Sequence, residues 1–504
     1  MTANTAAQNP IFSYLPFTYH LNLTSMRRRN YLKTMMLGTI STGAIIDMAC
    51  DPKTNSTPAV SAPTNPNPAL SMRGVTAANT MVRVDMDLYF EAAANLYHKT
   101  NNPNGAFPLN VAENKLSWPL LKKKIETIAH ETPVADWVAN YTNSVGADSF
   151  RAVMASFLSK FLAGCTIDPL HLCMAPGAAG AIELTSWILG EPGDVAVIPA
   201  PCYSVYKQDI GNRPGLERYN LITHREVSEL KNGLPLTTAH LDAALKDISA
   251  QGKRFRMLIL TNPDNPTGGI YSKDQLLAFT EWCLTHQVHL VVNEIYGLSL
   301  LNTSYPDIKD NYNGDVAFHS FANIVQEKKS DYLHLWYALS KDFGASGFRV
   351  GMVYSLNTVF RAAFNNLSPP GMVSNYAQWT FEQVLSDHAF VKQYIQTNQQ
   401  RLTENFATAT RVLKQLNVPF APSRGSLFVW LDLSEFLKEN TQDAEHELWM
   451  DLYKQAGVLL TPGDGFGHEK RGQFRLVYSY VVKEDLEVAM ERVKKYVEDR
   501  RKKG

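Results

Sequence analysis

Ala338-Leu339-Ser340-Lys341-Asp342-Phe343-Gly344-Ala345-Ser346-Gly347-Phe348-Arg349-Val350-Gly351 is the stretch that decides the fold of this 504-residue chain. It follows an apolar, aromatic run over residues 332–337, which predicts a buried strand. The small residues and glycines after Lys341 let the backbone approach a ligand closely. A partly desolvated lysine can lose its proton near neutral pH and form a Schiff base with an aldehyde. Arg349 can hold a phosphate through a bidentate contact, so the pair suits a ligand that carries both groups.

The spacing of this stretch follows the pattern S-K-x-x-G-x-x-G-x-R-x-G. It resembles the cofactor-lysine signature of the class I/II aminotransferase family, the fold-type-I pyridoxal-phosphate enzymes, and its nearest form resembles the 1-aminocyclopropane-1-carboxylate synthases. The resemblance covers roughly residues 85–500. It implies that pyridoxal 5'-phosphate is the cofactor and that the protein is a homodimer with its sites at the interface.

Strands alternate with helices along the chain, which predicts an α/β fold. We expect a three-layer, doubly wound, mostly parallel sheet in a large domain and a smaller α+β domain built from both chain ends. The predicted divisions are an export signal at 1–50, a linker at 51–80, the N-terminal part of the small domain at 81–145, the large domain at 146–385 and the C-terminal small domain at 386–504.

The composition is that of a globular enzyme. Hydrophobic residues make up 45% of the chain and charged residues 19%, while Lys plus Arg equals Asp plus Glu at 48 each. The balanced charge gives no reason to expect a nucleic-acid partner. The five cysteines show no C-x-x-C spacing and no H-E-x-x-H motif occurs, so no metal site is predicted.

The N-terminus resembles an export signal. The string from Arg28 to Lys33 is similar to the twin-arginine signal, and a mildly apolar run follows it as far as Cys50. Export of a folded protein would place it in the periplasm, or at a membrane if Cys50 is lipidated. A cytoplasmic protein with an N-terminal arm is the alternative. Residues 51–72 are rich in Pro, Ser, Asn and Thr and predict a linker.

A Gly-rich turn predicts a phosphate cup. The run from Gly177 through Ala178 and Ala179 lies between a short apolar strand and a helix, where free backbone N–H groups favour an anion. By the resemblance, Ala179 replaces the family's Thr and Ala338 replaces the Ser of the synthases. The cup would therefore rely on backbone N–H groups, Ser340 and Arg349.

Four residues are expected around the cofactor ring. Tyr203 follows a buried strand and matches the aromatic residue that stacks on the pyridine. Asn265, in the N-P-x-N-P-T-G string, and Tyr296 match the two donors to the phenolic oxygen. Asn293 stands where the family has an Asp that keeps the ring nitrogen protonated. An amide cannot supply that charge, so we expect a weaker electron sink.

Three further positions concern the substrate and the partner subunit. Arg475 matches the arginine that grips the substrate α-carboxylate, and Glu113 lies in an A-E-N segment near the substrate. Tyr141 matches a tyrosine that reaches the partner's cofactor phosphate. Ser144 is a departure, because the synthases carry a Tyr at that position.

The leading prediction is amino-group transfer between an amino acid and a 2-oxo acid, with Lys341 holding the cofactor and then moving the α-proton as base and acid. Three alternatives stay open. They are an elimination or cyclisation at the β- or γ-carbon, another pyridoxal-phosphate reaction that tolerates an unprotonated ring, and a cofactor-binding protein without turnover.

Overall fold

The computed structural model describes residues 67–80 and 83–503, and the elements named below lie in one compact unit, Ala69–Gly504. The predicted signal at 1–50, Cys50 and the linker up to residue 66 lie outside the described residues. The last part of the predicted linker contains a helix, α1 (Met72–Asn79), whose N-cap Ser71 accepts a hydrogen bond from the Gly74 N–H. The prolines of the linker end at Pro68, so none of them interrupts a helix over residues 72–79.

A seven-stranded sheet forms the large part of the fold, in the order β2-β8-β7-β6-β5-β3-β4. Neighbours from β7 to β4 are parallel, whereas β8 runs antiparallel to both β7 and β2. The mostly parallel sheet predicted from the alternation of strands and helices is therefore confirmed. The strands are β2 (Leu172–Pro176), β3 (Val195–Ala200), β4 (Glu217–Ile222), β5 (Phe255–Thr261), β6 (His289–Asn293), β7 (Leu333–Ala338) and β8 (Val350–Ser355).

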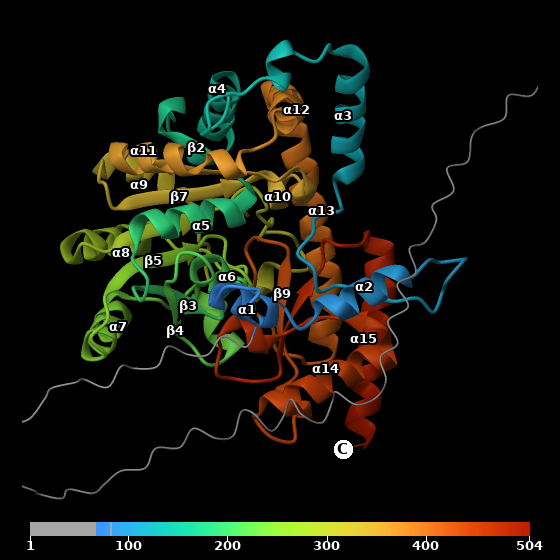
Figure 1. Ribbon diagram of the computed structural model, residues 1–504. Coiled ribbons are helices and arrows are strands. Elements are labelled where there is room, and N and C mark those ends of the chain that lie inside the picture. The colour runs from blue at the N-terminus through green and yellow to red at the C-terminus, as the bar shows by residue number, and fades with distance from the viewer. Residues whose placement is uncertain (1–66, 81–82, 504) are drawn as a thin grey trace, which may run out of the picture. The chain divides into compact units, whose positions relative to one another are not determined.

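Helices cover both faces of this sheet, which makes three layers (Figure 1). Successive residues of β5 show why: Met257 and Ile259 pack into one buried cluster, and Leu258 and Leu260 into another on the opposite face. One face carries α5 (Gly177–Leu189), α6 (Tyr206–Gly211) and α11 (Thr358–Leu367). The other carries α4 (Asp148–Leu158), α7 (Thr238–Ala250), α8 (Lys273–His286), α9 (Phe321–Lys328) and α12 (Asn375–Ser386).

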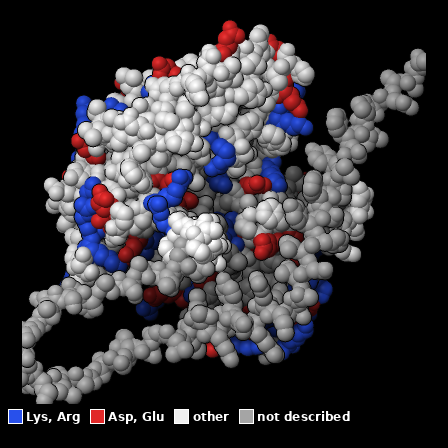
Figure 2. Space-filling model, in the orientation of Figure 1, with Lys and Arg blue, Asp and Glu red and all other residues white. Residues whose placement is uncertain are grey.

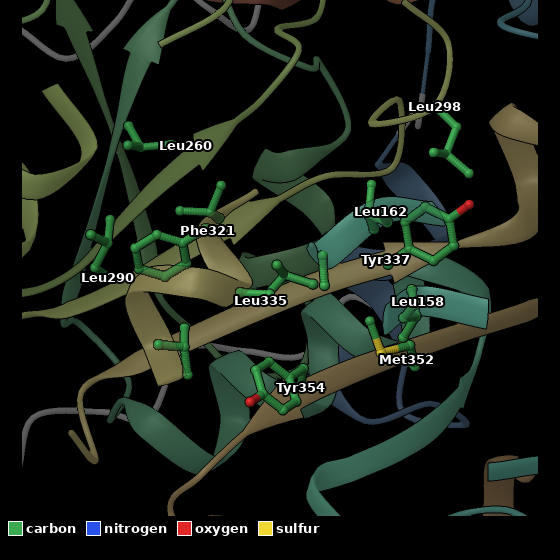
Figure 3. Close-up of a cluster of buried hydrophobic side chains, with 14 of the residues drawn as sticks. Leu158, Leu162, Leu260, Leu290, Leu298, Phe321, Leu335, Tyr337, Met352 and Tyr354 are labelled. Atoms are coloured by element: carbon green, nitrogen blue, oxygen red, sulfur yellow. The ribbon is translucent and has the colours of Figure 1, made fainter. Parts of the chain in front are cut away.

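Figure 3 shows part of the second cluster, where side chains from four neighbouring strands meet a helix. Leu260, Leu290, Leu335 and Met352 come from β5, β6, β7 and β8, and they lie with Leu158 of α4 in one buried group. Burying an aliphatic side chain of this size stabilises the fold by roughly 1.5–3 kcal/mol. The sheet is therefore a rigid base for the loops at its edge.

A second core joins the two ends of the chain. The three-stranded antiparallel sheet β11-β12-β9 and the parallel pair β1–β10 pack with residues 92–116 and 402–497 in a third buried cluster. In Figure 1 the blue N-terminal elements lie among the red C-terminal ones. The strands are β1 (Phe107–Pro108), β9 (Phe428–Asp432), β10 (Val458–Leu459), β11 (Thr461–Pro462) and β12 (Gln473–Val477), and the helices are α2 (Met86–Ala94), α14 (Gln442–Ala456) and α15 (Lys483–Lys503). The smaller α+β part predicted from both chain ends is confirmed, while the predicted domain limits stay a prediction.

One long helix belongs to both cores. α13 (His388–Gln415) buries Tyr394 in the cluster of the large sheet and Phe406 in the cluster of the smaller part. Between them, buried Asn398 accepts hydrogen bonds from Asn114 Nδ2 at 2.9 Å and Ser117 Oγ at 3.2 Å. The remaining helices are α3 (Trp118–Glu131), which precedes the large sheet, and the four-residue α10 (Leu339–Asp342).

The surface shows no extended region of one charge on the face in Figure 2, where basic and acidic side chains are interspersed. Among the described residues, none of the helices is both long enough and apolar enough to cross a membrane, and no cluster of three His, Cys, Asp or Glu residues could hold a metal ion.

Candidate active site

A cavity lies where the parallel strands end, the edge at which α/β folds bind ligands. Its lining comes from segments that are far apart in the sequence. The residues are Ala112, then Ala178, Ala179 and Ile182 of α5, Tyr203, Tyr206 and Asp209 after β3, Thr261 and Asn265 at the end of β5, Asn293, Ile295 and Tyr296 at the end of β6, and Ser340, Lys341, Ser346 and Arg349 after β7.

Lys341 lies in this cavity, one turn after β7. Its Nζ donates a hydrogen bond of 2.6 Å to the carbonyl oxygen of Ala112. Burial lowers the pKa of the Lys341 ammonium to about 8, and the nearby positive charges of Arg475 and Arg349 act in the same direction. Glu113 opposes this shift. About a tenth of Lys341 is therefore neutral at pH 7 and about half at pH 8, and the neutral amine is the form that attacks an aldehyde.

The phosphate end of the cavity is built around Arg349. Its guanidinium donates to the carbonyl oxygens of Ser346 at 3.0 Å and Pro176 at 3.1 Å. Gly177, at φ +78°, lies so close that a Cβ there would be 2.4 Å from an Arg349 nitrogen. Ser340 Oγ is buried and has no hydrogen-bond partner among the described residues. A glycine cradle at the start of α5, an arginine and the unpaired hydroxyl of Ser340 on α10 fit a phosphate.

Ala179 and Ala338, which stand where the family and the synthases have hydroxyl residues, have different consequences. Ala179 lines the cavity, so the missing hydroxyl leaves an apolar surface there. Ala338 is buried in the hydrophobic core at the end of β7 and does not line the cavity.

The ring end of the cavity holds three predicted residues in one hydrogen-bonded group. Asn265 Nδ2 donates to the Tyr296 hydroxyl at 3.3 Å, and Asn265 Oδ1 accepts from Arg475 at 3.0 Å. Tyr203 lines the same cavity, and burial raises the pKa of its hydroxyl to about 12. It therefore stays protonated at neutral pH and presents its ring to the cavity as an apolar face.

Asn293 also lines the cavity, and both ends of its amide are engaged. Nδ2 donates to the Tyr206 hydroxyl at 3.0 Å, and Oδ1 accepts from the Ile295 N–H at 3.2 Å. The Tyr206 hydroxyl lies 2.8 Å from Thr261 Oγ1. Asn293, Tyr206 and Thr261 therefore form one row of hydrogen-bonded residues along the cavity wall.

The acids that follow Asn293 and Lys341 point away from the cavity. Glu294 accepts from the Ser320 hydroxyl at 2.7 Å, and Asp342 accepts from the Ser299 hydroxyl at 2.6 Å and from Tyr337 at 3.1 Å. Burial raises the pKa of Glu294 to about 8 and that of Asp342 to about 7. These contacts fix the backbone on which the two cavity residues stand.

Arg475 of β12 is fully buried beside Asn265. Its guanidinium lies over the rings of Phe428 and Phe466, at 4.5 and 5.2 Å from their centroids, and it donates to the Asn110 carbonyl at 2.8 Å. Burial, with the charge of Arg83, lowers the pKa of Arg475 to about 10. Arg475 Nε has no partner among the described residues, so the guanidinium keeps a donor for an anionic ligand.

Besides Gly177 and Arg475, which lie against residues of the lining, two predicted residues lie outside the cavity lining. Glu113 pairs with Lys115 at 3.3 Å and lines a neighbouring groove with Trp118, Gly347 and Phe348. Tyr141 is fully exposed at 102% of its reference area. Ser144, the departure three residues later, donates to both Asn365 oxygens at 2.8 Å. The roles predicted for Glu113 and Tyr141 stay predictions.

Sequence reasoning missed Tyr206 and Asp209. Both lie on α6, three residues apart, and therefore face the same side. Asp209 Oδ2 is buried without a hydrogen-bond partner among the described residues, and burial together with Glu183 raises the pKa of Asp209 to about 7. The signal that could have found them is their spacing from Tyr203, one helical turn and two.

An α/β fold with a lysine of lowered pKa, a phosphate cradle and paired donors at the ring end defines a pyridoxal-phosphate-dependent enzyme. The model of the family "Aminotransferase class I and II" matches residues 108–493, and the chain belongs to this family. Pyridoxal phosphate is its cofactor, and the residues described above fit that group.

Comparison with curated proteins gives relatives named as 1-aminocyclopropane-1-carboxylate synthases. The chain is 32% identical over 421 residues to 1-aminocyclopropane-1-carboxylate synthase 2 of Cucurbita pepo, covering 81% of this chain and 82% of the relative. It is 32% identical over 417 residues to 1-aminocyclopropane-1-carboxylate synthase 5 of Oryza sativa subsp. japonica, covering 80% and 75%.

Solved structures share the fold at lower identity. An archaeal alanine:glyoxylate aminotransferase has a TM-score of 0.70 at 17% identity, covering 86% of this chain and 98% of the other. Aspartate aminotransferase of Thermus thermophilus with maleate has a TM-score of 0.67 at 19% identity, covering 84% and 99%. The doubly wound fold is the one expected from the sequence.

Proposed function

We propose that this protein is an aminotransferase that moves an amino group between an amino acid and a 2-oxo acid. The observation that carries the proposal is the combination of Lys341, whose pKa burial lowers to about 8, with Arg475, a buried guanidinium that keeps an unpaired donor. An amine that takes and returns a proton and a clamp for a carboxylate are the two groups that such a transfer needs from the protein.

Residues in different parts of the cavity would have different roles in this reaction. Pyridoxal phosphate, when bound, supplies an aldehyde for the amino group and a ring that withdraws electrons from the bonds of the substrate's α-carbon. Arg349, Ser340 and the N-terminus of α5 would hold its phosphate, and Asn265 with Tyr296 its phenolic oxygen. Arg475 would orient the substrate through its carboxylate, and Lys341 Nζ would accept the α-proton and return it.

The test is product analysis with purified, cofactor-loaded protein and a panel of amino acids with and without 2-oxo acids. A new amino acid formed from the added 2-oxo acid supports transfer. Ammonia together with a 2-oxo acid indicates elimination, and cofactor binding without any product indicates a binding protein. Either of these last two results rejects the proposal.

A cyclisation of the kind named in the curated relatives is the second candidate. It is favoured by 32% identity over most of both chains. The amino-acid panel should therefore include members with a leaving group on the γ-carbon, such as sulfonium amino acids. Release of 1-aminocyclopropane-1-carboxylate from one of them would establish the cyclase.

We also propose a homodimer in which the partner's Tyr141 completes the phosphate end. Tyr141 is fully exposed in the single chain. Ser346 lines both the cavity and the groove that contains Gly347. Mixing inactive Lys341→Ala and Tyr141→Ala subunits tests this. Shared sites would restore activity in the hybrid dimer, and independent sites would not.

Export remains a proposal supported by the arginine pair alone. Replacement of Arg28 and Arg29 by Lys should keep the protein in the cytoplasm if a twin-arginine signal acts. Fractionation of cells that carry the two forms checks it, and an unchanged distribution favours the cytoplasmic alternative.

A further inference from the structure

The residue that faces the cofactor's ring nitrogen by the family pattern is an amide whose orientation the protein fixes. A backbone N–H can only donate, so the atom that it contacts at 3.2 Å must be the amide oxygen of Asn293. The amide nitrogen then faces the Tyr206 hydroxyl at 3.0 Å. The assignment of the two ends therefore rests on the Ile295 N–H, and Tyr206 agrees with it.

The hydrogens of Asn293 Nδ2 that are not yet used determine which further hydrogen bond the amide can donate. Asn293 Nδ2 carries two hydrogens, and Tyr206 accepts one of them. The Tyr206 hydroxyl can pass its own hydrogen to Thr261 Oγ1 at 2.8 Å. The second Nδ2 hydrogen has no partner in this network. A ring nitrogen that accepts this hydrogen must carry a lone pair, so it must be unprotonated.

The charges around the cavity also favour an unprotonated ring nitrogen. Arg349 lines the cavity, and buried Arg475 lies beside it, so two guanidinium groups disfavour a further positive charge on the ring. Asp209 is the carboxylate in the lining, and it is close enough to Arg349 and Glu183 to be affected by both. Among the described residues that line the cavity, no other carboxylate could stabilise a protonated ring.

We propose that Asn293, held in place by Tyr206 and by the backbone N–H of Ile295, donates a hydrogen bond to the ring nitrogen of pyridoxal phosphate and keeps that nitrogen unprotonated. Tyr206 is a positioning residue in this scheme, since it acts through the amide. The inference depends on cofactor binding alone and holds for transfer, elimination or cyclisation alike.

The experiment loads the protein with cofactor labelled with nitrogen-15 in the ring and records its NMR resonance, which differs strongly between neutral and protonated pyridine. Free cofactor at high and low pH supplies the two reference positions. We expect the wild-type resonance at the neutral position and that of Asn293→Asp at the protonated position. A wild-type resonance at the protonated position overturns the proposal, and this measurement needs no turnover.

Two variants separate the contributions. Asp209→Asn should leave the wild-type resonance at the neutral position, and a change would show that Asp209 sets the state of the ring. Tyr206→Phe should keep the neutral position but lower cofactor affinity about fivefold, because the amide loses one of its two anchors. Unchanged affinity in Tyr206→Phe would reject the positioning role.

Discussion

The phosphate end and the ring-nitrogen end of the cavity are built in different ways. Arg349, Ser340 and Lys341 come from one continuous stretch at fixed spacings, and Gly177 fits against the arginine that this stretch supplies. The ring-nitrogen end combines Asn293 with Tyr206 and Asp209 from another strand and helix. The comparison teaches that the end which fixes the cofactor keeps its arginine and glycine despite the alanine at position 179, while the end which sets the cofactor's electronics has lost its charged residue.

The largest expected effect is at the lysine that both ends share. Lys341→Ala should lower kcat by about a thousandfold, because it removes the proton-transfer group, whose contribution is typically 10²–10⁴. Borohydride treatment followed by peptide mapping should fix the cofactor to position 341 in the wild type. Fixation at another lysine would contradict the assignment of both ends.

The phosphate end can be tested by substitutions at Arg349 and at Gly177. Arg349→Gln should weaken cofactor binding by about ten- to a hundredfold, because hydrogen bonds to charged groups contribute roughly 1.5–3 kcal/mol. Gly177→Ala should give a loss of the same order, since its Cβ would be 2.4 Å from the guanidinium and φ is +78°. Fluorescence titration with pyridoxal phosphate measures both.

Gly371→Ala is the matched control, because a Cβ there meets only the Pro176 side chain at an ordinary 3.7 Å. We expect wild-type affinity in this variant. If Gly177→Ala also binds normally, the cradle at the phosphate end is not as tight as the geometry indicates.

The substrate side is expected to respond less strongly. Arg475→Lys should raise KM by about tenfold with little change in cofactor affinity, because an ammonium cannot reproduce the fork that grips a carboxylate. Steady-state kinetics with the best substrate of the panel checks this. A fall in kcat at unchanged KM would mean that Arg475 does not bind the ground-state carboxylate.

The smallest effect concerns pH. Because the pKa of Lys341 is lowered to about 8, the rate of cofactor capture by the apoprotein should rise with pH up to about 8 and then level off. Glu113→Gln should move this midpoint to lower pH, since Glu113 favours the charged lysine. Lys207→Gln, an exposed change away from this pair, serves as the control. Stopped-flow absorbance measures the rates, and a midpoint that Glu113→Gln does not move would show that the carboxylate does not reach the lysine.

How much the sequence could predict follows from the same contrast. The sheet and the phosphate end are encoded locally, by apolar runs and by short motifs such as that around Lys341, so reading along the chain finds them. Tyr206 and Asp209 reach the cavity because parallel strands bring α6 beside the end of β6, so their spacing from Tyr203 becomes informative only once that strand order is known. The antiparallel direction of β8 could not be predicted either, since the composition of this strand resembles that of a parallel strand.

The continuous helix α13 has a mechanical consequence. At 28 residues it is about 42 Å long and behaves as a strut with one half in each core. Its midpoint Asn398 bonds Asn114, and Asn114 Nδ2 also contacts the carbonyl oxygen of Lys341 at 3.2 Å. These contacts connect the strut to the backbone that carries Lys341, so a tilt of the smaller part against the sheet would also move the amine.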